Sequence, residues 1–270
     1  MVELVQILKC LYEKTGCDFR EYRQSTLLRR IARRMHATGS PTYQAYLDRL
    51  TGENVESHNL LKELTIHVTE FFREPEHWET VAKKVFPDRL AQRTHDTVKI
   101  WSAGCATGEE AYSLAILIEE ARCQRSEVRI LGTDLDESSL LSAREGTYSE
   151  AKLKNLPIPL REKYLQRGGK GYQIVPVIRR SVQFRRLDLV GGECPGTFDL
   201  ISCRNVLIYF SKELQETVLL KLHRALNPNG FLWLGKAESL WGRPRELFEC
   251  VDKRAKIFRK GFNVCESGEL

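Results

Sequence analysis

The stretch "VKIWSAGCATGEEAYSLAILIEEA", residues 98–121, decides the fold of this chain. It reads as a buried strand, a turn that contains Gly104 and Gly108, and an apolar helix that opens with Glu109 and Glu110. In an open α/β sheet, a strand, a glycine turn and a helix in this order form the floor of the ligand site at the carboxyl ends of the strands. The chemistry of this turn therefore predicts the kind of ligand.

The chain on either side of this stretch divides into two regions. Residues 1–85 show only helical periodicity, with the turn "TGSPTY" (38–43) between two helices, and this predicts a small all-helical domain. In residues 86–270 short apolar strands alternate with helices, which predicts a doubly wound α/β domain. The expected strands are "VKIWSAG", "VRILGTDL", "SVQFRRLDL", "FDLISCRNV" and "GFLWLG", with helices near 109–123, 137–145 and 211–226.

Two segments depart from this simple alternation. Alternating apolar side chains at residues 172–177 predict a small antiparallel excursion from the main sheet. Residues 255–259 predict a last strand that runs antiparallel and lies at an edge of the sheet.

Length and composition limit the class of protein. The chain has 270 residues, of which 42% are hydrophobic, enough for a globular core. No stretch reaches the roughly 18 uninterrupted apolar residues of a membrane span, and the first residues lack the layout of a secretory signal, so we expect a cytoplasmic protein. The eight cysteines form no Cys-x-x-Cys pair and no zinc-type spacing with histidine, which predicts free thiols and no metal.

The acidic character of the turn distinguishes between cofactors. Its spacing is G-x-x-x-G rather than the G-x-G-x-x-G of dinucleotide sites, and Glu109 and Glu110 would repel a diphosphate but attract a cation. Either glutamate would also suit the positive end of the helix dipole. The next strand ends in Asp134, where a carboxylate can accept both hydroxyls of a ribose. The pattern favours S-adenosylmethionine, which is cationic and carries no phosphate, over NAD.

Three segments together resemble the chemotaxis receptor methyltransferases, the CheR family. They are "TIHVTEFFREPEHW" (65–78), "IWSAGCATGEEAYSLA" (100–115) and "FDLISCRNVLIYF" (198–210), followed by "NPNGFLWLGKAESL". The resemblance implies a Rossmann-like class I methyltransferase domain at 86–270, preceded by a small all-helical N-terminal domain at 1–85. It also implies a small antiparallel β-subdomain inserted at about 164–184.

The activity that the resemblance implies is methyl transfer from S-adenosyl-L-methionine to glutamate side chains of chemotaxis receptors, which leaves S-adenosyl-L-homocysteine. The expected partner is the cytoplasmic helical domain of methyl-accepting receptors, with no nucleic acid, no membrane insertion and a monomeric enzyme. A carboxylate is already ionised at neutral pH, so the reaction needs alignment rather than a general base. By resemblance, Arg73 and Tyr209 lie near the methyl group and are the expected catalytic residues.

The resemblance also implies a set of cofactor contacts. These are His67, Thr69, Arg73, Glu109, Asp134, Asp188, Leu189, Arg204 and Asn205. Glu109 would hold the methionine ammonium and Asp134 the ribose, while Asp188 would lie near the adenine edge. Many members of the family have asparagine where this chain has His67, and an imidazole can donate or accept a hydrogen bond as the amide does.

A basic helix in the N-terminal region is the expected contact for the protein substrate. In "EYRQSTLLRRIARRM" (21–35) the arginines project away from the apolar side, and the whole chain carries a formal charge of +6. If the substrate helices are acidic, as the resemblance implies, these arginines attract and orient them. The expected substrate-binding residues are Arg23, Arg29, Arg30, Arg33 and Arg34. A solvated helix face or a nucleic-acid contact is the alternative for this charge.

Several alternatives share parts of this pattern. A nucleic-acid methyltransferase would have the same cofactor site, but no aromatic platform stands among the basic residues and no NPPY-like motif is present. A non-catalytic regulatory module that binds S-adenosylmethionine would lose Arg73 or Tyr209, and both are present. The acidic turn argues against a dinucleotide oxidoreductase. A methyltransferase that acts on a different signalling protein would share every feature.

Overall fold

The computed structural model describes residues 2–65, 68–87, 97–121 and 127–261. The helices, in chain order, are α1 (Val2–Thr15), α2 (Gln24–Thr38), α3 (Tyr43–Gly52), α4 (Asn54–Leu64), α5 (Pro75–Lys84), α7 (Glu109–Glu120), α8 (Glu137–Glu145), α9 (Ile158–Tyr164), α10 (Pro176–Arg180), α11 (Lys212–Arg224) and α12 (Pro244–Leu247), with short 3₁₀ turns η1 (Glu150–Leu153) and η2 (Leu207–Tyr209). The strands are β1 (Val98–Ala103), β2 (Val128–Asp134), β3 (Thr147–Tyr148), β4 (Leu165–Gly168), β5 (Gly171–Ile174), β6 (Val182–Arg186), β7 (Phe198–Cys203), β8 (Leu226–Leu234), β9 (Phe248–Asp252) and β10 (Ile257–Lys260).

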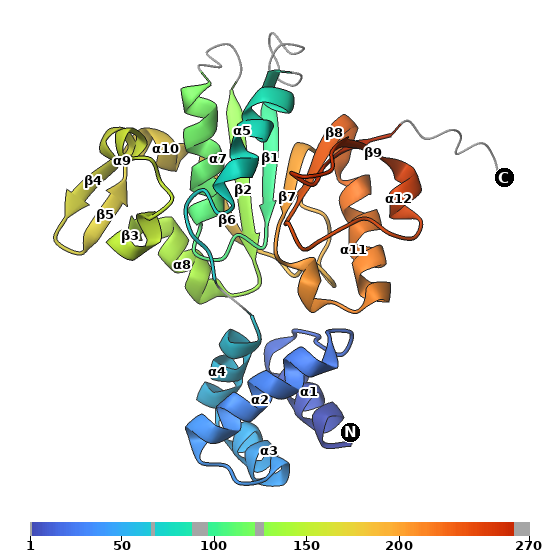
Figure 1. Ribbon diagram of the computed structural model, residues 1–270. Helices are drawn as coiled ribbons and strands as arrows, with labels where there is room; N and C mark the ends of the chain where they lie inside the picture. Colours follow the sequence, from blue (N-terminus) through green and yellow to red (C-terminus); the bar gives the residue numbers. More distant parts are fainter. Residues whose placement is uncertain (1, 66–67, 88–96, 122–126, 262–270) are drawn as a thin grey trace.

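The helices α1 to α4 pack around a core of their own, and Figure 1 shows them as a separate group below the sheet. Each contributes an apolar stripe to this core, such as Leu11 from α1 and Ile31 from α2, both fully buried. The predicted turn between two helices is confirmed, because α2 ends at Thr38 and α3 begins at Tyr43. Gly39 ends α2 in the left-handed conformation that glycine adopts without strain.

A buried ion pair ties three of these helices together. Arg34 of α2 donates two hydrogen bonds to the Glu56 carboxylate of α4, at 3.0 and 2.7 Å, and the Tyr46 hydroxyl of α3 donates a third at 2.7 Å. Burial raises the pKa of Glu56, but these hydrogen bonds outweigh it and hold the pKa below its usual value. The carboxylate is therefore ionised at neutral pH and joins α2, α3 and α4 at one point.

The described strands outside the inserted segment form one sheet in the order β6-β2-β1-β7-β8-β10-β9. The neighbours from β6 to β8 pair in parallel, and this confirms the predicted α/β sheet. The predicted last strand is antiparallel, as expected, but its predicted place at the edge is wrong. β10 lies between β8 and β9, where its Ile257 and Phe258 are buried, whereas the edge strand β9 exposes Glu249 and Cys250.

A second, three-stranded antiparallel sheet in the order β3-β5-β4 lies at one side of the main sheet, with α9 and α10 (Figure 1). Its strands lie between residues 147 and 174, within the connection from α8 to β6. The predicted antiparallel excursion at 172–177 is confirmed in part, because β5 ends at Ile174 and Pro176 begins α10. Residues 182–184 belong to β6 of the main sheet, and the small sheet begins with β3 at Thr147. For the inserted subdomain, predicted at about 164–184, we therefore propose bounds of about 147–180.

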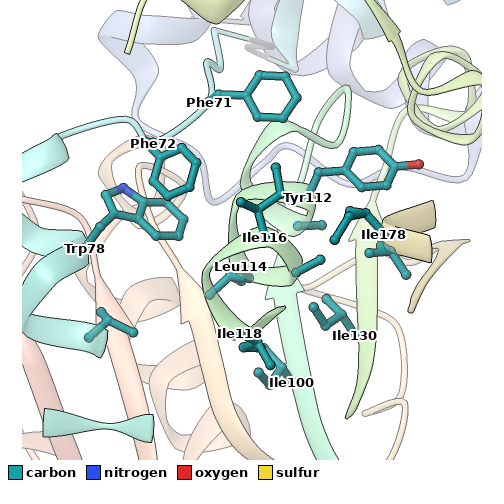
Figure 2. Close-up of a cluster of buried hydrophobic side chains, with 14 of the residues drawn as sticks. Phe71, Phe72, Trp78, Ile100, Tyr112, Leu114, Ile116, Ile118, Ile130 and Ile178 are labelled. Carbon is teal, nitrogen blue, oxygen red and sulfur yellow. The ribbon is translucent and has the colours of Figure 1, made fainter. Parts of the chain in front are cut away.

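The core on one face of the main sheet is built around helix α7. Figure 2 shows Phe71, Phe72 and Trp78 in the same cluster as side chains of α7 and of the strands β1 and β2. Trp78 belongs to α5 and meets Trp233 of β8 edge to face, at 4.8 Å between ring centroids. Because α5 buries its side chains here and not among α1 to α4, we propose that the domain boundary, predicted at residue 85, lies nearer residue 65.

The buried ion pair of the helical domain gives a first prediction. Glu56→Gln should lower the free energy of unfolding by about 3 kcal/mol at neutral pH, since it leaves Arg34 without its charged partner. A carboxylate whose pKa is depressed by folding stabilises the protein above its usual pKa of 4.5 and loses this effect as the pH falls. Urea titrations from neutral pH to about pH 3 should therefore show the difference between variant and parent narrowing.

The control is Glu53→Gln, which breaks the exposed pair with Arg49 and should cost no more than about 1 kcal/mol. Equal stability of the Glu56→Gln variant and the parent at neutral pH would contradict the role of this ion pair.

Candidate functional site

A cavity lies at the carboxyl ends of the parallel strands, between the sheet and the helical domain. It holds about 1190 Å³ of empty space, counting its open mouth. Such a position, where the strand order reverses between β1 and β7, is the usual ligand site of an open α/β sheet. The residues that line it are Tyr22, Leu64, Thr65, Val68, Thr69, Glu70, Arg73, Trp78, Gly104, Ala106, Glu110, Thr133, Asp134, Leu135, Leu187, Asp188, Leu189, Arg204, Asn205, Val206, Tyr209 and Phe210.

The glycine turn after β1 shapes the floor of the cavity. Gly104 has φ +78°, and a Cβ at this position would stand 2.4 Å from Cγ2 of Val206 in the loop after β7. The turn continues through Ala106, whose backbone N–H donates to Asp134 at 2.8 Å. The second oxygen of Asp134 accepts from the N–H of Asp136 at 3.0 Å. These bonds hold the Asp134 carboxylate at the cavity wall, at the end of the second strand where the sequence predicts a ribose contact.

A buried arginine organises the acidic end of the cavity. The side chain of Arg204 is 1% exposed and lies 4.2 Å from the ring centroid of Trp233. It donates to Glu74 at 2.9 Å and to the backbone carbonyl of Arg73 at 2.8 Å, and it lies 3.4 Å from Glu110. Burial raises the pKa of Glu74, but the charge and hydrogen bond of Arg204, together with the charges of His77 and Arg73, outweigh it and lower the pKa below its usual value. Two carboxylates thus surround this buried guanidinium, and one of them, Glu110, lines the cavity.

The two glutamates that open α7 occupy different places. Glu110 lines the cavity and accepts a hydrogen bond from the Ser102 hydroxyl at 2.7 Å. Glu109 does not line it: this carboxylate is fully buried, accepts from the Thr107 hydroxyl at 2.7 Å and pairs with Lys152 at 3.0 Å. The sequence predicts Glu109 as the ammonium contact; because Glu110 and not Glu109 lines the cavity, we propose Glu110 as the contact for a cationic ligand.

The two expected catalytic residues line the same cavity. Arg73 is anchored by a hydrogen bond from Nη1 to the Val68 carbonyl at 2.8 Å. Tyr209 is half-buried, and this burial raises the pKa of its hydroxyl against the lowering effect of Arg30 and Arg73. The hydroxyl therefore stays protonated at neutral pH and is available as a donor.

Backbone strain gathers around this site. Phe72, Glu74, Ala106 and Asn205 all have positive φ values, between 46° and 60°, although none is a glycine. Phe72 and Glu74 flank Arg73, while Ala106 and Asn205 line the cavity. Non-glycine residues in the left-handed region are uncommon and concentrate at functional sites, which supports this cavity as the site.

The helical domain closes one wall of the cavity. Tyr22 and Phe210 form an isolated antiparallel bridge, and the N–H of Arg23 donates to the Tyr209 carbonyl at 2.9 Å. The rings of Tyr22 and Phe210 meet edge to face at 4.8 Å. The segment that carries Tyr209 is therefore fixed directly to the loop that precedes α2.

The arginines of the predicted basic helix divide into two groups. Arg30 and Arg34 are partly buried and bind Glu63 and Glu56 within the helical domain. The side chain of Arg33 is 67% exposed, even though Nη1 lies 3.2 Å from Glu63. Arg23 and Arg29 are exposed as well.

The cavity brings together most of the residues that the sequence predicted as contacts. Those that line it are Thr69, Arg73, Asp134, Asp188, Leu189, Arg204, Asn205 and Tyr209. Predicted residue His67 lies outside the described residues. Tyr22 and Leu135 also line the cavity, although no sequence motif marks them, and so does Glu110, for which the sequence predicts no specific contact.

The donor set suits S-adenosylmethionine. Of the charged residues described in the lining, four are carboxylates and two are guanidinium groups, a balance that favours a cation over a diphosphate. Leu135, Leu187 and Leu189 supply an apolar wall of the kind that an adenine ring requires. Among the described residues no group of histidine, cysteine, aspartate and glutamate is arranged to hold a metal ion. None of the helices in the described ranges has the length and apolar character that a membrane crossing needs.

Strand order, antiparallel β10 and an acidic cavity at the switch point define a class I methyltransferase that uses S-adenosylmethionine as its cofactor. The model of the family described as "CheR methyltransferase, SAM binding domain" matches residues 67–257, and that of "CheR methyltransferase, all-alpha domain" matches residues 3–65. The chain belongs to the CheR methyltransferase family, and the predicted resemblance and cofactor are confirmed.

Three relatives show the range of similarity. The "Chemotaxis protein methyltransferase" of Borreliella burgdorferi is 31% identical, over 89% of each chain. "Chemotaxis protein methyltransferase 2" of Pseudomonas aeruginosa is 34% identical, over 87% of this chain and 85% of its own length. An "Uncharacterized 104.1 kDa protein in hypE 3'region" of Rhodobacter capsulatus is 37% identical over 95% of this chain, which spans only 27% of that protein.

The different positions of the two glutamates give a second prediction. Glu110→Gln should weaken S-adenosylmethionine binding by about 1.5–3 kcal/mol, because it removes a charged acceptor from the cavity wall. Glu109→Gln is the matched variant: it should lower the melting temperature through the lost Lys152 ion pair, with a smaller change in affinity. Titration calorimetry on both variants measures the difference. Equal affinity of the Glu110→Gln variant and the parent would remove Glu110 from the site.

Proposed function

We propose that this protein methylates glutamate side chains of chemotaxis receptors and forms glutamyl methyl esters. The observation that carries the proposal is the cavity itself, which combines an acidic cofactor end with Arg73 and Tyr209 and lies against the arginine-bearing helical domain. The two relatives named as chemotaxis protein methyltransferases support the same substrate class.

Methyl transfer to an ionised carboxylate requires little from the protein beyond alignment of the two reactants. When bound, S-adenosylmethionine supplies a methyl group that is attached to a positively charged sulfur. After the transfer this sulfur is the neutral thioether of S-adenosylhomocysteine. A carbon–sulfur bond breaks, a carbon–oxygen bond to the glutamate carboxylate forms, and no proton needs to move. The residues of the chain contribute by holding the acceptor oxygen in line behind the methyl group and by excluding water.

Arg73 and Tyr209 are the residues we assign to this alignment. The guanidinium of Arg73 is fixed at Val68 by one N–H and has further donors with which to orient a carboxylate. The protonated Tyr209 hydroxyl can donate to either reactant. A tight ion pair would also reduce the reactivity of the carboxylate, so we expect Arg73 to act mainly on its position.

The helical domain is the surface that we propose for the receptor. Its exposed Arg23, Arg29 and Arg33 lie on the element that is bonded to the Tyr209 segment, so an acidic receptor helix held there would lie close to the mouth of the cavity. Arg30 and Arg34 are occupied by ion pairs, and we assign them to the stability of the domain. A cytoplasmic, monomeric enzyme is consistent with this mode of action.

The proposed activity has a direct test. A radiolabelled methyl group should pass from S-adenosylmethionine to the cytoplasmic fragment of a receptor from the same cell and be released by mild alkali, as an ester is. The matched control is the same fragment with its candidate glutamates replaced by glutamine, which should stay unlabelled. Label that survives alkali, or absence of label on any receptor despite measured cofactor binding, would overturn the proposal.

The receptor surface has a separate test. Reversal of the exposed arginines, in the double variant Arg29→Glu and Arg33→Glu, should lower the methylation rate at low salt by about tenfold, because it removes the attraction for an acidic helix. The deficit should shrink as salt is added, and cofactor affinity should be unchanged.

The matched control for this test is the double variant Arg243→Glu and Arg245→Glu. It changes the net charge equally at exposed positions around α12 and should keep the parent's rate. Equal rates for all three proteins at low salt would exclude the α2 arginines from receptor binding.

A further inference from the structure

Glu238 follows β8 and is one of the most deeply buried charged residues of the sheet domain, at 4% exposure. Its carboxylate accepts hydrogen bonds from four backbone N–H groups and no side chain among the described bonds. Oε1 accepts from Val206 at 2.9 Å and from Leu207 at 2.8 Å, while Oε2 accepts from Asn205 at 3.0 Å and from Gly235 at 2.7 Å. Three of these donors are successive residues of the loop after β7.

Successive N–H groups that converge on one anion form a nest, the arrangement by which backbone loops bind phosphate. Here the anion is a side chain of the same protein. Asn205 begins the nest in the left-handed conformation, with φ +60°, which an isolated loop would populate rarely. Gly235 lets the two loops approach, because a Cβ there would stand 2.8 Å from the Asn205 nitrogen and 2.9 Å from Glu238.

The loop held in this way carries the chemistry of the site. Asn205 lines the cavity, and Tyr209 lies at the end of the 3₁₀ turn that begins at Leu207. Burial raises the pKa of Glu238, and the four N–H bonds oppose this. The protein thus places a carboxylate at an unfavourable, buried position next to this loop, although Glu238 is absent from the cavity lining.

We propose that Glu238 is a positioning residue for methyl transfer, whose carboxylate fixes the 204–209 loop so that Asn205 and Tyr209 meet cofactor and acceptor in a productive geometry. The inference rests on the proposed function for its catalytic readout. Its structural readout is independent, because hydrogen exchange of the loop amides and cofactor affinity can be measured without any receptor.

The test compares Glu238→Gln with a matched control, Asp199→Asn. Glutamine keeps the size of the side chain but turns an N–H₂ group toward two N–H donors, which breaks two of the four bonds. Asp199 is equally buried and accepts from the Lys99 N–H, but it lies at the opposite end of β7, away from the cavity. Each variant is assayed for methyl transfer, for S-adenosylmethionine affinity and for hydrogen exchange in peptides that cover residues 203–210.

For Glu238→Gln we expect kcat to fall ~10- to 100-fold, as for a displacement of about 1 Å at a reacting group. Cofactor affinity should weaken only a few-fold, and exchange should accelerate in the 203–210 peptides and at Gly235, whose N–H also donates to Glu238. Asp199→Asn should change the melting temperature and none of these three quantities. If Glu238→Gln has the same kcat and the same hydrogen exchange as Asp199→Asn and the parent, the proposal is wrong.

A second variant covers the case in which Glu238→Gln does not fold. Glu238→Asp keeps the charge but shortens the side chain by one methylene, so its carboxylate cannot reach all four donors, and kcat should fall by an intermediate factor. If both variants fail to fold while Asp199→Asn folds, Glu238 serves the fold and not the positioning, and the proposal is wrong. If the parent itself methylates no receptor, the proposed function fails, while exchange and affinity still decide the role of Glu238.

Discussion

The buried charge of Arg204 is the constraint on which the site depends. A guanidinium at 1% exposure must be neutralised and hydrogen-bonded, since the cost of removing a charge from water is otherwise several kcal/mol. Its partners come from distant parts of the chain: Glu74 at the start of α5 and Glu110 in α7. Arg204 itself directly follows β7, so one side chain joins the segment before α5, the first crossover helix and the sheet at a common point. The position of Glu110 in the cavity wall follows from this arrangement.

The helical domain forms one wall of the cavity at the carboxyl ends of the strands. Parallel strands leave their carboxyl ends open, and here the bridge between Tyr22 and Phe210 covers one side of that opening. Because the same bridge fixes the backbone of Tyr209, the surface that we propose for receptor binding and the residue that we propose for alignment belong to one rigid contact. The two proposed roles would thereby be connected through a backbone hydrogen bond.

Strands and helices that follow from periodic apolar residues could be predicted from the sequence, whereas side-chain partners that depend on tertiary packing could not. The strands, α7 and the place of Asp134 in the cavity wall follow from apolar runs and from the position of a carboxylate at a strand end. Glu109 and Glu110 are separated by a rotation of about 100° around the helix axis. Glu109 pairs with Lys152 and Glu110 lies beside Arg204, and neither of these partners is marked by a motif. The projection of α2 could not reveal that Arg34 meets Glu56, because that pair joins two separate helices.

The place of β10 has a consequence for how the domain is made. The strand that completes the sheet between β8 and β9 leaves the ribosome after every other described strand, since it ends at Lys260. Until β10 has been synthesised, one edge of β8 is unpaired at residues 231–233, which include the apolar Phe231 and Trp233. Another chain can pair with such an open edge. A strand that comes late among the described strands but lies inside the sheet thus makes the solubility of the nascent sheet domain depend on how soon residues 257–260 follow β8.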